Sequence, residues 1–112
     1  MAKSEISGDV KEFVPNRSEL AATVRRIAED SGRVGFSVHS IDRMEKRGIA
    51  RLDGLRVLRM GELRGEIECG KSTGEWKCKM VAKLKGSREI GVVTIVVSNG
   101  RLFVKTVEWE DT

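Results

Sequence analysis

The chain is poor in several residues that often identify an enzyme or a secreted protein: its 112 residues contain no tyrosine, one histidine, one proline and two cysteines. Two cysteines are too few for a disulfide framework and indicate reduced thiols. A zinc site would need two more ligands besides those thiols, and the single histidine lies far upstream of them. No stretch approaches the ~18 consecutive apolar residues of a membrane-spanning helix. We therefore expect no metal, no cofactor and no membrane association.

The first twelve residues, MAKSEISGDVKE, contain no apolar stretch of the signal-peptide type, which predicts a cytoplasmic protein. What the chain does have is charge: charged residues make up 34% of it, and the net charge is +4. Acidic residues gather near the two ends, and the span from Arg43 to Lys85 carries much of the positive charge. This balance permits a nucleic-acid partner without requiring one.

The length predicts one domain. Residues 1–15 are expected to form a polar lead-in and residues 16–112 a single α+β domain. Its N-terminal half predicts two to three helices. Asn16 resembles the start of a capping box and begins a helix expected over 17–30. A second helix is expected to be capped by Ser37 or Ser40 and to end at Arg47, before a glycine.

A third helix is expected over Leu52–Met60. Its core side is predicted to consist of Ile49, Leu52, Leu55, Val57 and Leu58. From Glu62 onward the apolar residues recur at every second position instead of at helical spacing, which is typical of strands. The strands are expected over 65–69, 76–84, 90–97 and 102–109. Helices followed by strands indicate an α+β fold with the helices packed on a small antiparallel meander.

Two of these strands carry more specific patterns. In 76–84, alternation predicts a buried face with Trp76, Cys78 and Met80 and a solvated basic face with Lys77 and Lys79. The stretch 90–97 is almost continuously apolar and β-branched, which favours a central strand covered on both faces. Asn99-Gly100 then predicts a hairpin.

Gly65–Ser72 matches the phosphate-loop pattern GxxxxGK[ST], which requires a following helix to hold phosphates. The residues after Ser72 alternate like a strand, and two carboxylates inside the loop would repel a polyphosphate. We therefore interpret the stretch as a hairpin turn. Cys69 and Cys78 flank it and are expected to be small buried side chains, perhaps opposite one another on paired strands.

The second helix carries the most specific pattern. At 100° per residue, His39, Arg43 and Arg47 share one face, flanked by Lys46. Val38, Ile41 and Met44 lie opposite, so the helix is expected to pack through them. The cationic strip can be a solvated surface, an element that braces the fold, or a site for phosphate.

The segment HSIDRMEKRGI (His39–Ile49), followed by Asp53, Val57-Leu58 and Gly61, resembles the signature of a bacterial domain-of-unknown-function family, number 4258. The resemblance covers about residues 34–109. Members of that family are often considered relatives of the RelE-like and MqsR-like messenger-RNA interferases, which are toxins encoded beside an antitoxin. The resemblance thus implies a RelE-like or barnase-like architecture, RNA as substrate and a cognate antitoxin as partner.

If the chain is such an endoribonuclease, metal-independent cleavage needs a base, an acid and cations around the phosphate. His39 is then the expected acid or base, because histidine titrates near neutrality when unperturbed. Arg43 and Arg47 are the expected phosphate clamp, completing a catalytic set of His39, Arg43 and Arg47. The residues expected to bind RNA are Lys46, Lys77, Lys79 and Lys105. The alternative is a non-catalytic module that uses the same surface to bind nucleic acid or an acidic protein.

Overall fold

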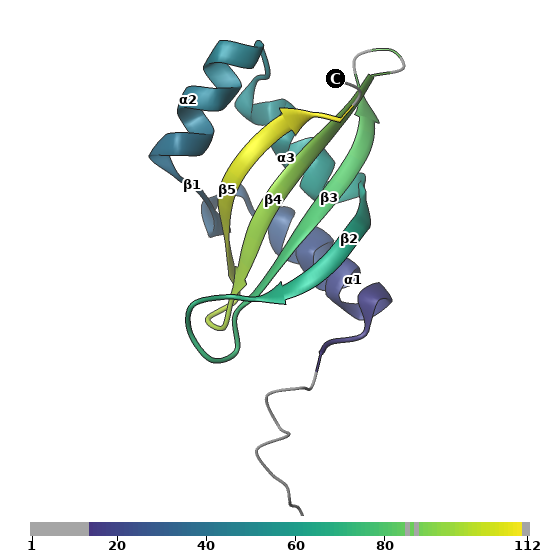
Figure 1. Ribbon diagram of the computed structural model, residues 1–112, viewed down its shortest axis with the longest axis vertical. Coiled ribbons are helices and arrows are strands. Elements are labelled where there is room, and N and C mark those ends of the chain that lie inside the picture. The colour runs from purple at the N-terminus through teal and green to yellow at the C-terminus, as the bar shows by residue number, and fades with distance from the viewer. Residues whose placement is uncertain (1–13, 85, 87, 111–112) are drawn as a thin grey trace, which may run out of the picture.

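The computed structural model describes residues 14–84, 86 and 88–110, and this part of the chain forms an α+β domain (Figure 1). Its helices are α1 (Arg17–Ala28), α2 (Val38–Arg47) and α3 (Arg51–Met60), with a single 3-10 turn, η2 (Ser31–Arg33). Its strands are β1 (Val34–Phe36), β2 (Glu62–Cys69), β3 (Trp76–Leu84), β4 (Arg88–Val97) and β5 (Arg101–Trp109). The predicted helices and strands are present, with bounds that differ by a few residues.

The five strands form one sheet in the order β1-β5-β4-β3-β2. Strands β2 to β5 are the predicted antiparallel meander. The short strand β1 adds to the far edge and runs parallel to β5, with Gly35 opposite Phe103. The sheet is therefore mixed, and the prediction of a purely antiparallel sheet is wrong. A three-residue strand that pairs with a distant segment leaves no local pattern in the sequence.

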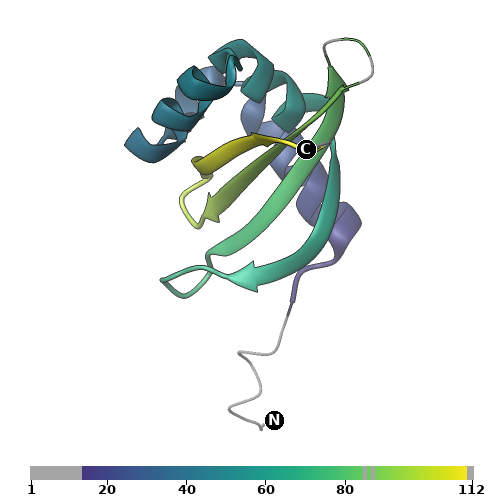
Figure 2. The same cartoon turned by 45° about the horizontal axis from the view of Figure 1, so that its top comes forward.

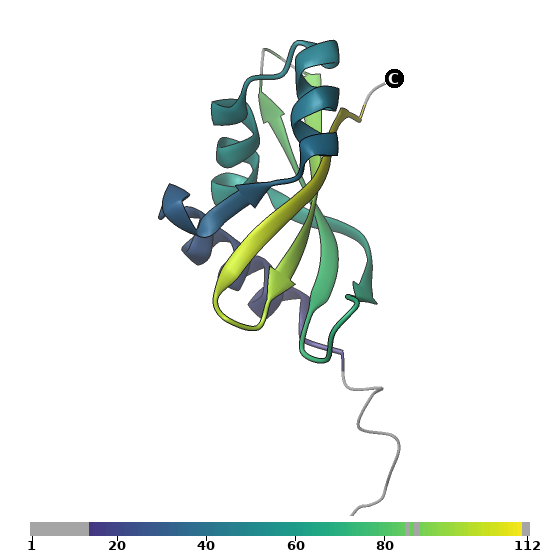
Figure 3. The same cartoon turned by 90° about the vertical axis from the view of Figure 1, so that its left-hand side faces the viewer.

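The helices lie on one side of the sheet (Figures 1 and 3). Helices α1 and α3 cover the sheet, and α2 lies along β5 at the end where β1 stops. The side chains buried between these layers include Val24, Leu58, Met80, Val92 and Val107. No helix of the described residues covers the opposite side, as the turned views in Figures 2 and 3 show. We call that side the open face.

The prediction that the central strand is covered on both faces is wrong, because β4 has one side on the open face. Ile90, Val92 and Thr94 are fully buried against the helices, whereas Ile95 and Val97 are only half-buried. The strand is central, as predicted, but one of its two sides has no covering layer. A continuous apolar run indicates a buried strand without showing that both sides are covered.

The start of each of the first two helices follows its predicted cap. The side chain of Asn16 accepts a hydrogen bond from the Glu19 N–H at 3.1 Å, and the Ser37 hydroxyl accepts one from the Ser40 N–H at 3.0 Å. Helix α1 ends at Ala28, two residues before the predicted end, because Asp30 instead caps η2 through the Gly32 N–H. In the third helix Leu52 is half-exposed, so its predicted place in the core is wrong.

Helix α2 packs through a different side from the one predicted. Val38 is 85% exposed and Ile41 is 39% exposed, while Ser40 and Met44 are buried. The expected apolar side of Val38, Ile41 and Met44 is therefore wrong except for Met44. The Ser40 hydroxyl donates to the Ser37 carbonyl, which satisfies it inside the fold and lets a small polar residue occupy the packed side.

The phosphate-loop pattern lies in β2 and the turn that leads into β3, so no helix follows it. The hairpin interpretation is confirmed. Its two cysteines differ: Cys78 is buried, and Cys69 is exposed and pairs with Trp76 rather than with Cys78. Burial raises the pKa of the Cys78 thiol to about 11, against a small opposing effect of Arg17. The prediction that both cysteines are buried is wrong for Cys69.

Candidate nucleic-acid interface

Near the end of the open face that carries the β2–β3 and β4–β5 turns, a single row of residues runs across all five strands. Glu68 of β2 lies opposite Lys77, Lys77 opposite Ile95, and Ile95 opposite Phe103. Phe103 in turn lies opposite Gly35 of β1. Neighbours in such a row point to the same side of the sheet. The row therefore has a charged end at Glu68 and Lys77 and an aromatic end at Phe103, with the apolar Ile95 between them.

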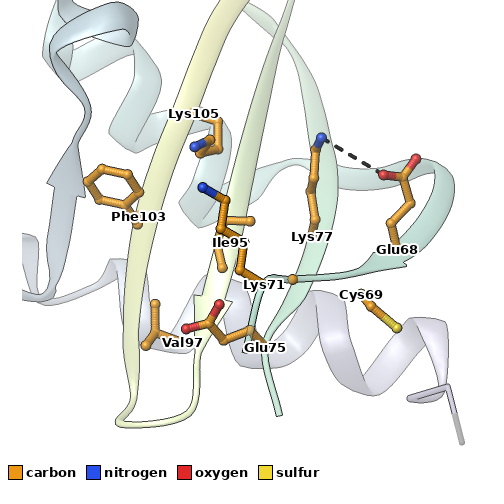
Figure 4. A pocket seen from close by; sticks show the side chains of 10 residues that line it. Glu68, Cys69, Lys71, Glu75, Lys77, Ile95, Val97, Phe103 and Lys105 are labelled. Carbon is orange, nitrogen blue, oxygen red and sulfur yellow. Dashed lines mark ion pairs between the residues drawn. The ribbon is translucent and has the colours of Figure 1, made fainter. Parts of the chain in front are cut away.

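A pocket of about 540 Å³ lies over this row, where the turn between β2 and β3 approaches β5. It is lined by Glu68, Cys69, Gly70, Lys71, Glu75, Lys77, Ile95, Val97, Phe103 and Lys105. Figure 4 shows these side chains, which come from the end of β2, from the β2–β3 turn and from strands β3, β4 and β5. We call this pocket the lysine hollow.

Three ammonium groups stand around the lysine hollow. In Figure 4 the side chains of Lys71 and Lys105 extend into the same space above Ile95. Lys77 is 3.8 Å from Glu68, an exposed pair that neutralises little of its charge. Within the described residues no carboxylate forms an ion pair with Lys71 or Lys105. The hollow is therefore cationic and has unpaired donors directed into it.

The turn that carries Lys71 is held in shape by its own hydrogen bonds. The Gly70 N–H donates to the Glu75 carbonyl at 2.8 Å, and the Glu75 N–H donates to the Ser72 carbonyl at 3.1 Å. The Glu75 carboxylate accepts from the Ser72 N–H at 3.3 Å. This carboxylate thus serves the turn, and the turn places Lys71 over the sheet.

Phe103 contributes the aromatic part of the lysine hollow. Its side chain is 40% exposed, which makes it one of the exposed large apolar groups of the fold. The Lys105 Nζ stands 5.7 Å from the centre of the ring, so cation and ring face the same space. An exposed ring beside free ammonium groups is a surface on which a base can stack while its phosphate is neutralised.

Lys79 lies two residues from Lys77 on β3 and differs from the lysines of the hollow because it has close acidic partners. Its Nζ is 2.9 Å from Glu110 and 3.3 Å from Glu108. Partial burial alone would lower the pKa of Lys79, but its bonds to Glu110 and Glu108 outweigh that effect and raise the pKa. Its charge is therefore compensated inside the protein by Glu108 and Glu110.

The predicted strip on α2 divides into two parts. Arg43 Nε donates to His39 Nε2 at 3.5 Å on the exposed side of the helix, and Lys46 pairs with Asp42 at 3.3 Å. Arg47 turns the other way: its Nη1 donates to the Val107 carbonyl at 2.6 Å. Arg47 therefore holds the end of α2 against β5, the bracing role that the sequence left open.

The predicted catalytic residues on α2 and the predicted RNA-binding lysines on the strands lie on neighbouring parts of the molecule. The Ser37 hydroxyl donates to the Lys105 carbonyl at 3.2 Å, so α2 begins beside the strand segment that carries Lys105. Lys77 and Lys105 are brought together in the lysine hollow, whereas His39, Arg43 and Lys46 are not among its lining residues. Sequence reasoning missed Lys71 and Phe103. Lys71 is part of the phosphate-loop pattern, and rejecting that pattern as a phosphate site also removed Lys71 from the candidate residues.

Comparison with protein-family models, with curated proteins and with solved structures finds no match. In the described part of the chain no helix is long and apolar enough to cross a membrane. Nor do the described residues bring together three histidine, cysteine or acidic side chains in a group that could hold a metal ion. The family resemblance of His39–Ile49 stays a prediction.

Proposed function

We propose that this chain binds single-stranded RNA on the open face of its sheet. One observation supports this most directly. Lys71, Lys77 and Lys105 converge on a hollow that also holds an exposed aromatic ring, and two of these lysines have no acidic partner among the described residues. Cations beside an aromatic platform are the usual elements of single-strand recognition.

The shape of the site favours a single strand over a duplex. A base can stack on Phe103 only if it is unpaired and turned outward, as bases are in loops and single strands. Lysine is a compact point charge on a flexible stem, which suits phosphates whose positions vary along a flexible strand. An acidic peptide would satisfy the lysines but would leave the exposed ring without a stacking partner.

The binding proposal is tested with a labelled 12-nucleotide single-stranded RNA, whose affinity is measured by fluorescence anisotropy at several salt concentrations. Replacing Lys71 and Lys105 together by glutamine is expected to weaken binding about tenfold or more at low salt. The slope of log affinity against log salt should fall by ~0.7 for each phosphate that the variant no longer neutralises.

Lys46→Gln combined with Lys83→Gln is the matched control, since both lysines are exposed and lie outside the hollow, and the pair removes the same two charges. It should change the affinity less than twofold. Equal affinities and equal salt slopes for the double variant and the wild type would reject the proposal. The melting temperatures of all variants are compared first, so that unfolding is not mistaken for weaker binding.

Cleavage is a second proposal, favoured by the contact between His39 and Arg43 on the exposed side of α2. In this reaction Arg43 turns from His39 to the phosphate, and the lone pair of His39 Nε2 that this releases accepts the proton of a ribose 2′-OH. The 2′-oxygen bonds to phosphorus, the bond from phosphorus to the 5′-oxygen breaks, and the leaving oxygen takes up a proton from water. Arg43 would stabilise the charge on the phosphate, and the products would end in a 2′,3′-cyclic phosphate and a 5′-hydroxyl.

Cleavage is tested by incubating labelled RNA with the protein in the presence of a chelator and identifying the ends of the products. His39→Ala should abolish cleavage and leave RNA affinity within twofold. RNA that stays intact at high protein concentration would reject the cleavage proposal. The binding proposal would remain, since it rests on different residues.

A cognate antitoxin is proposed as the protein partner, with acidic side chains placed over the lysine hollow. The test is competition: the product of the neighbouring gene should displace labelled RNA from the wild-type chain. It should bind the Lys71→Gln, Lys105→Gln double variant at least tenfold more weakly. A partner that binds both forms equally well must use another surface.

A further inference from the structure

A second hollow of about 400 Å³ lies next to the lysine hollow on the open face. It is lined by Gly35, Val97, Asn99, Arg101, Leu102 and Phe103. Val97 and Phe103 line both hollows, so the Phe103 ring stands at the boundary between them. We call this second pocket the arginine hollow.

The arginine hollow exists because the row across the sheet ends in a glycine. Gly35 lies opposite Phe103 and has no side chain to fill the space beside the ring. A Cβ placed on Gly35 would lie 3.5 Å from Phe103 Cδ1, an ordinary contact distance. Any longer side chain at this position would occupy the hollow, whereas the backbone itself does not require glycine there.

The arginine hollow also has its own cation. Arg101 is exposed, and its Nη2 donates to the Gly32 carbonyl at 3.3 Å. A guanidinium has five N–H donors, so this single bond leaves most of them available for a phosphate. On each side of the Phe103 ring there is thus an apolar floor, one face of the hollow formed by the ring itself, and at least one cation that can bind a phosphate.

We propose that the two hollows are adjacent nucleotide subsites, so that the open face binds two consecutive nucleotides of a single strand across Phe103. The inference rests on the proposed RNA-binding function and extends it. One nucleotide places its phosphate among the three lysines, and the next lies in the arginine hollow beside Gly35. The ligand class is therefore a dinucleotide step or a longer single strand, not a mononucleotide.

The test is competition against the labelled 12-nucleotide RNA by 5′-phosphorylated oligoadenylates of one to four residues. In the wild type, the step from one to two nucleotides is expected to raise the affinity about tenfold, because a second base can stack and a second phosphate is neutralised. The step from two to three should be smaller. A dinucleotide that competes no better than the mononucleotide would overturn the inference.

Gly35→Leu and Arg101→Gln locate the second subsite. Each is expected to remove most of the increase in affinity from one to two nucleotides and to leave the mononucleotide affinity within twofold. Gly35→Ala is the control, because a methyl group fits at contact distance without filling the hollow. Should Gly35→Leu fail to fold, Arg101→Gln decides alone, since Arg101 is exposed and outside the core.

Failure of this inference differs from failure of the proposed function. If the 12-nucleotide RNA binds and Lys71→Gln weakens it, but Arg101→Gln and Gly35→Leu leave the dinucleotide unaffected, only the second subsite is rejected. If the 12-nucleotide RNA does not bind at all, both proposals fall. If a 12-residue polyglutamate binds as tightly as RNA and Phe103→Leu does not weaken its binding, the occupant of the open face is an acidic protein rather than RNA.

Discussion

The helix side of the sheet and its open face use positive charge in different ways. On the helix side, arginines donate to main-chain carbonyl groups: Arg25 to Gly61 at 3.0 Å, Arg47 to Val107 at 2.6 Å and Arg59 to Ala28 at 2.7 Å. On the open face, Lys71 and Lys105 have no such partner among the described residues.

The difference follows from the chemistry of the two side chains. A guanidinium is planar, weakly hydrated and rich in donors, so it can satisfy carbonyl oxygens at the ends of helices and strands while partly buried. An ammonium group is strongly hydrated and remains at the surface unless a charged ligand takes the place of water. In this chain arginine mainly stabilises the fold, and lysine is left available for a ligand.

The largest contrast between the two sides is expected at two glycines. A Cβ on Gly61 would lie 2.5 Å from the Val57 carbonyl oxygen and 2.7 Å from that of Val81, both of them backbone atoms. Gly61→Ala should therefore lower the free energy of unfolding by about 3 kcal/mol. Gly35→Ala on the open face should change it by less than about 0.5 kcal/mol. Urea titration measures both, and equal decreases would contradict the contrast.

The next contrast compares two arginines that lie one turn apart on α2. Arg47→Met keeps most of the side chain but removes the bond to the Val107 carbonyl, which should cost about 2 kcal/mol and lower the melting temperature by about 8 °C. Arg43→Met removes only an exposed contact with His39 at 3.5 Å. Its expected cost is below about 0.5 kcal/mol. Scanning calorimetry should rank the two variants in this order.

The two cysteines give a contrast that depends on pH. The folded pKa of Cys78 is raised to about 11 from an ordinary value of 9.0, so its contribution to stability is complete below pH 9 and is lost as the pH rises toward 11. At pH 10 the decrease in stability should be about 1 kcal/mol. Comparing urea titrations at pH 8 and pH 10 for the wild type and Cys78→Ala isolates this contribution. Cys69→Ala should show the wild-type dependence on pH.

The smallest contrast concerns two lysines of equal charge. Lys105→Gln should weaken binding of the 12-nucleotide RNA about fivefold at low salt, because Lys105 lines the lysine hollow and has no acidic partner in the described chain. Lys46→Gln should change it less than twofold, since Lys46 lies on α2 outside the lysine hollow. Anisotropy measures both, and similar decreases in affinity would show that net charge alone drives binding.

Most of the fold could be predicted from sequence because its signals are local. The caps at Asn16 and Ser37, the alternation in β3 and the Asn99-Gly100 turn each depend on a few neighbouring residues. The parallel pairing of β1 with β5 could not be predicted, because it joins segments nearly 70 residues apart without a local pattern. Sequence also could not show that one side of the sheet is uncovered.

The candidate site was predicted only in part, for two physical reasons. The strip on α2 was judged by hydrophobic periodicity, which expects apolar residues on the packed side. There the Ser40 hydroxyl instead donates to the Ser37 carbonyl, and Arg47 donates to the Val107 carbonyl of β5. Lys71 and Phe103 come from segments that meet only in three dimensions. Lys77 was identified because alternation in β3 predicts a solvated basic face, whereas Lys105 lies on β5, and β4 separates the two strands.

The β2 edge of the sheet limits how this protein can associate with others. Arg17 donates to the carbonyl groups of Leu63 and Gly65, and the register of β2 shifts between Arg64 and Glu68. An edge whose acceptors are already bonded and whose backbone is bulged is a poor template for another strand. At this edge a protein partner must therefore recognise side chains rather than extend the sheet, and the edge is protected from strand-by-strand aggregation.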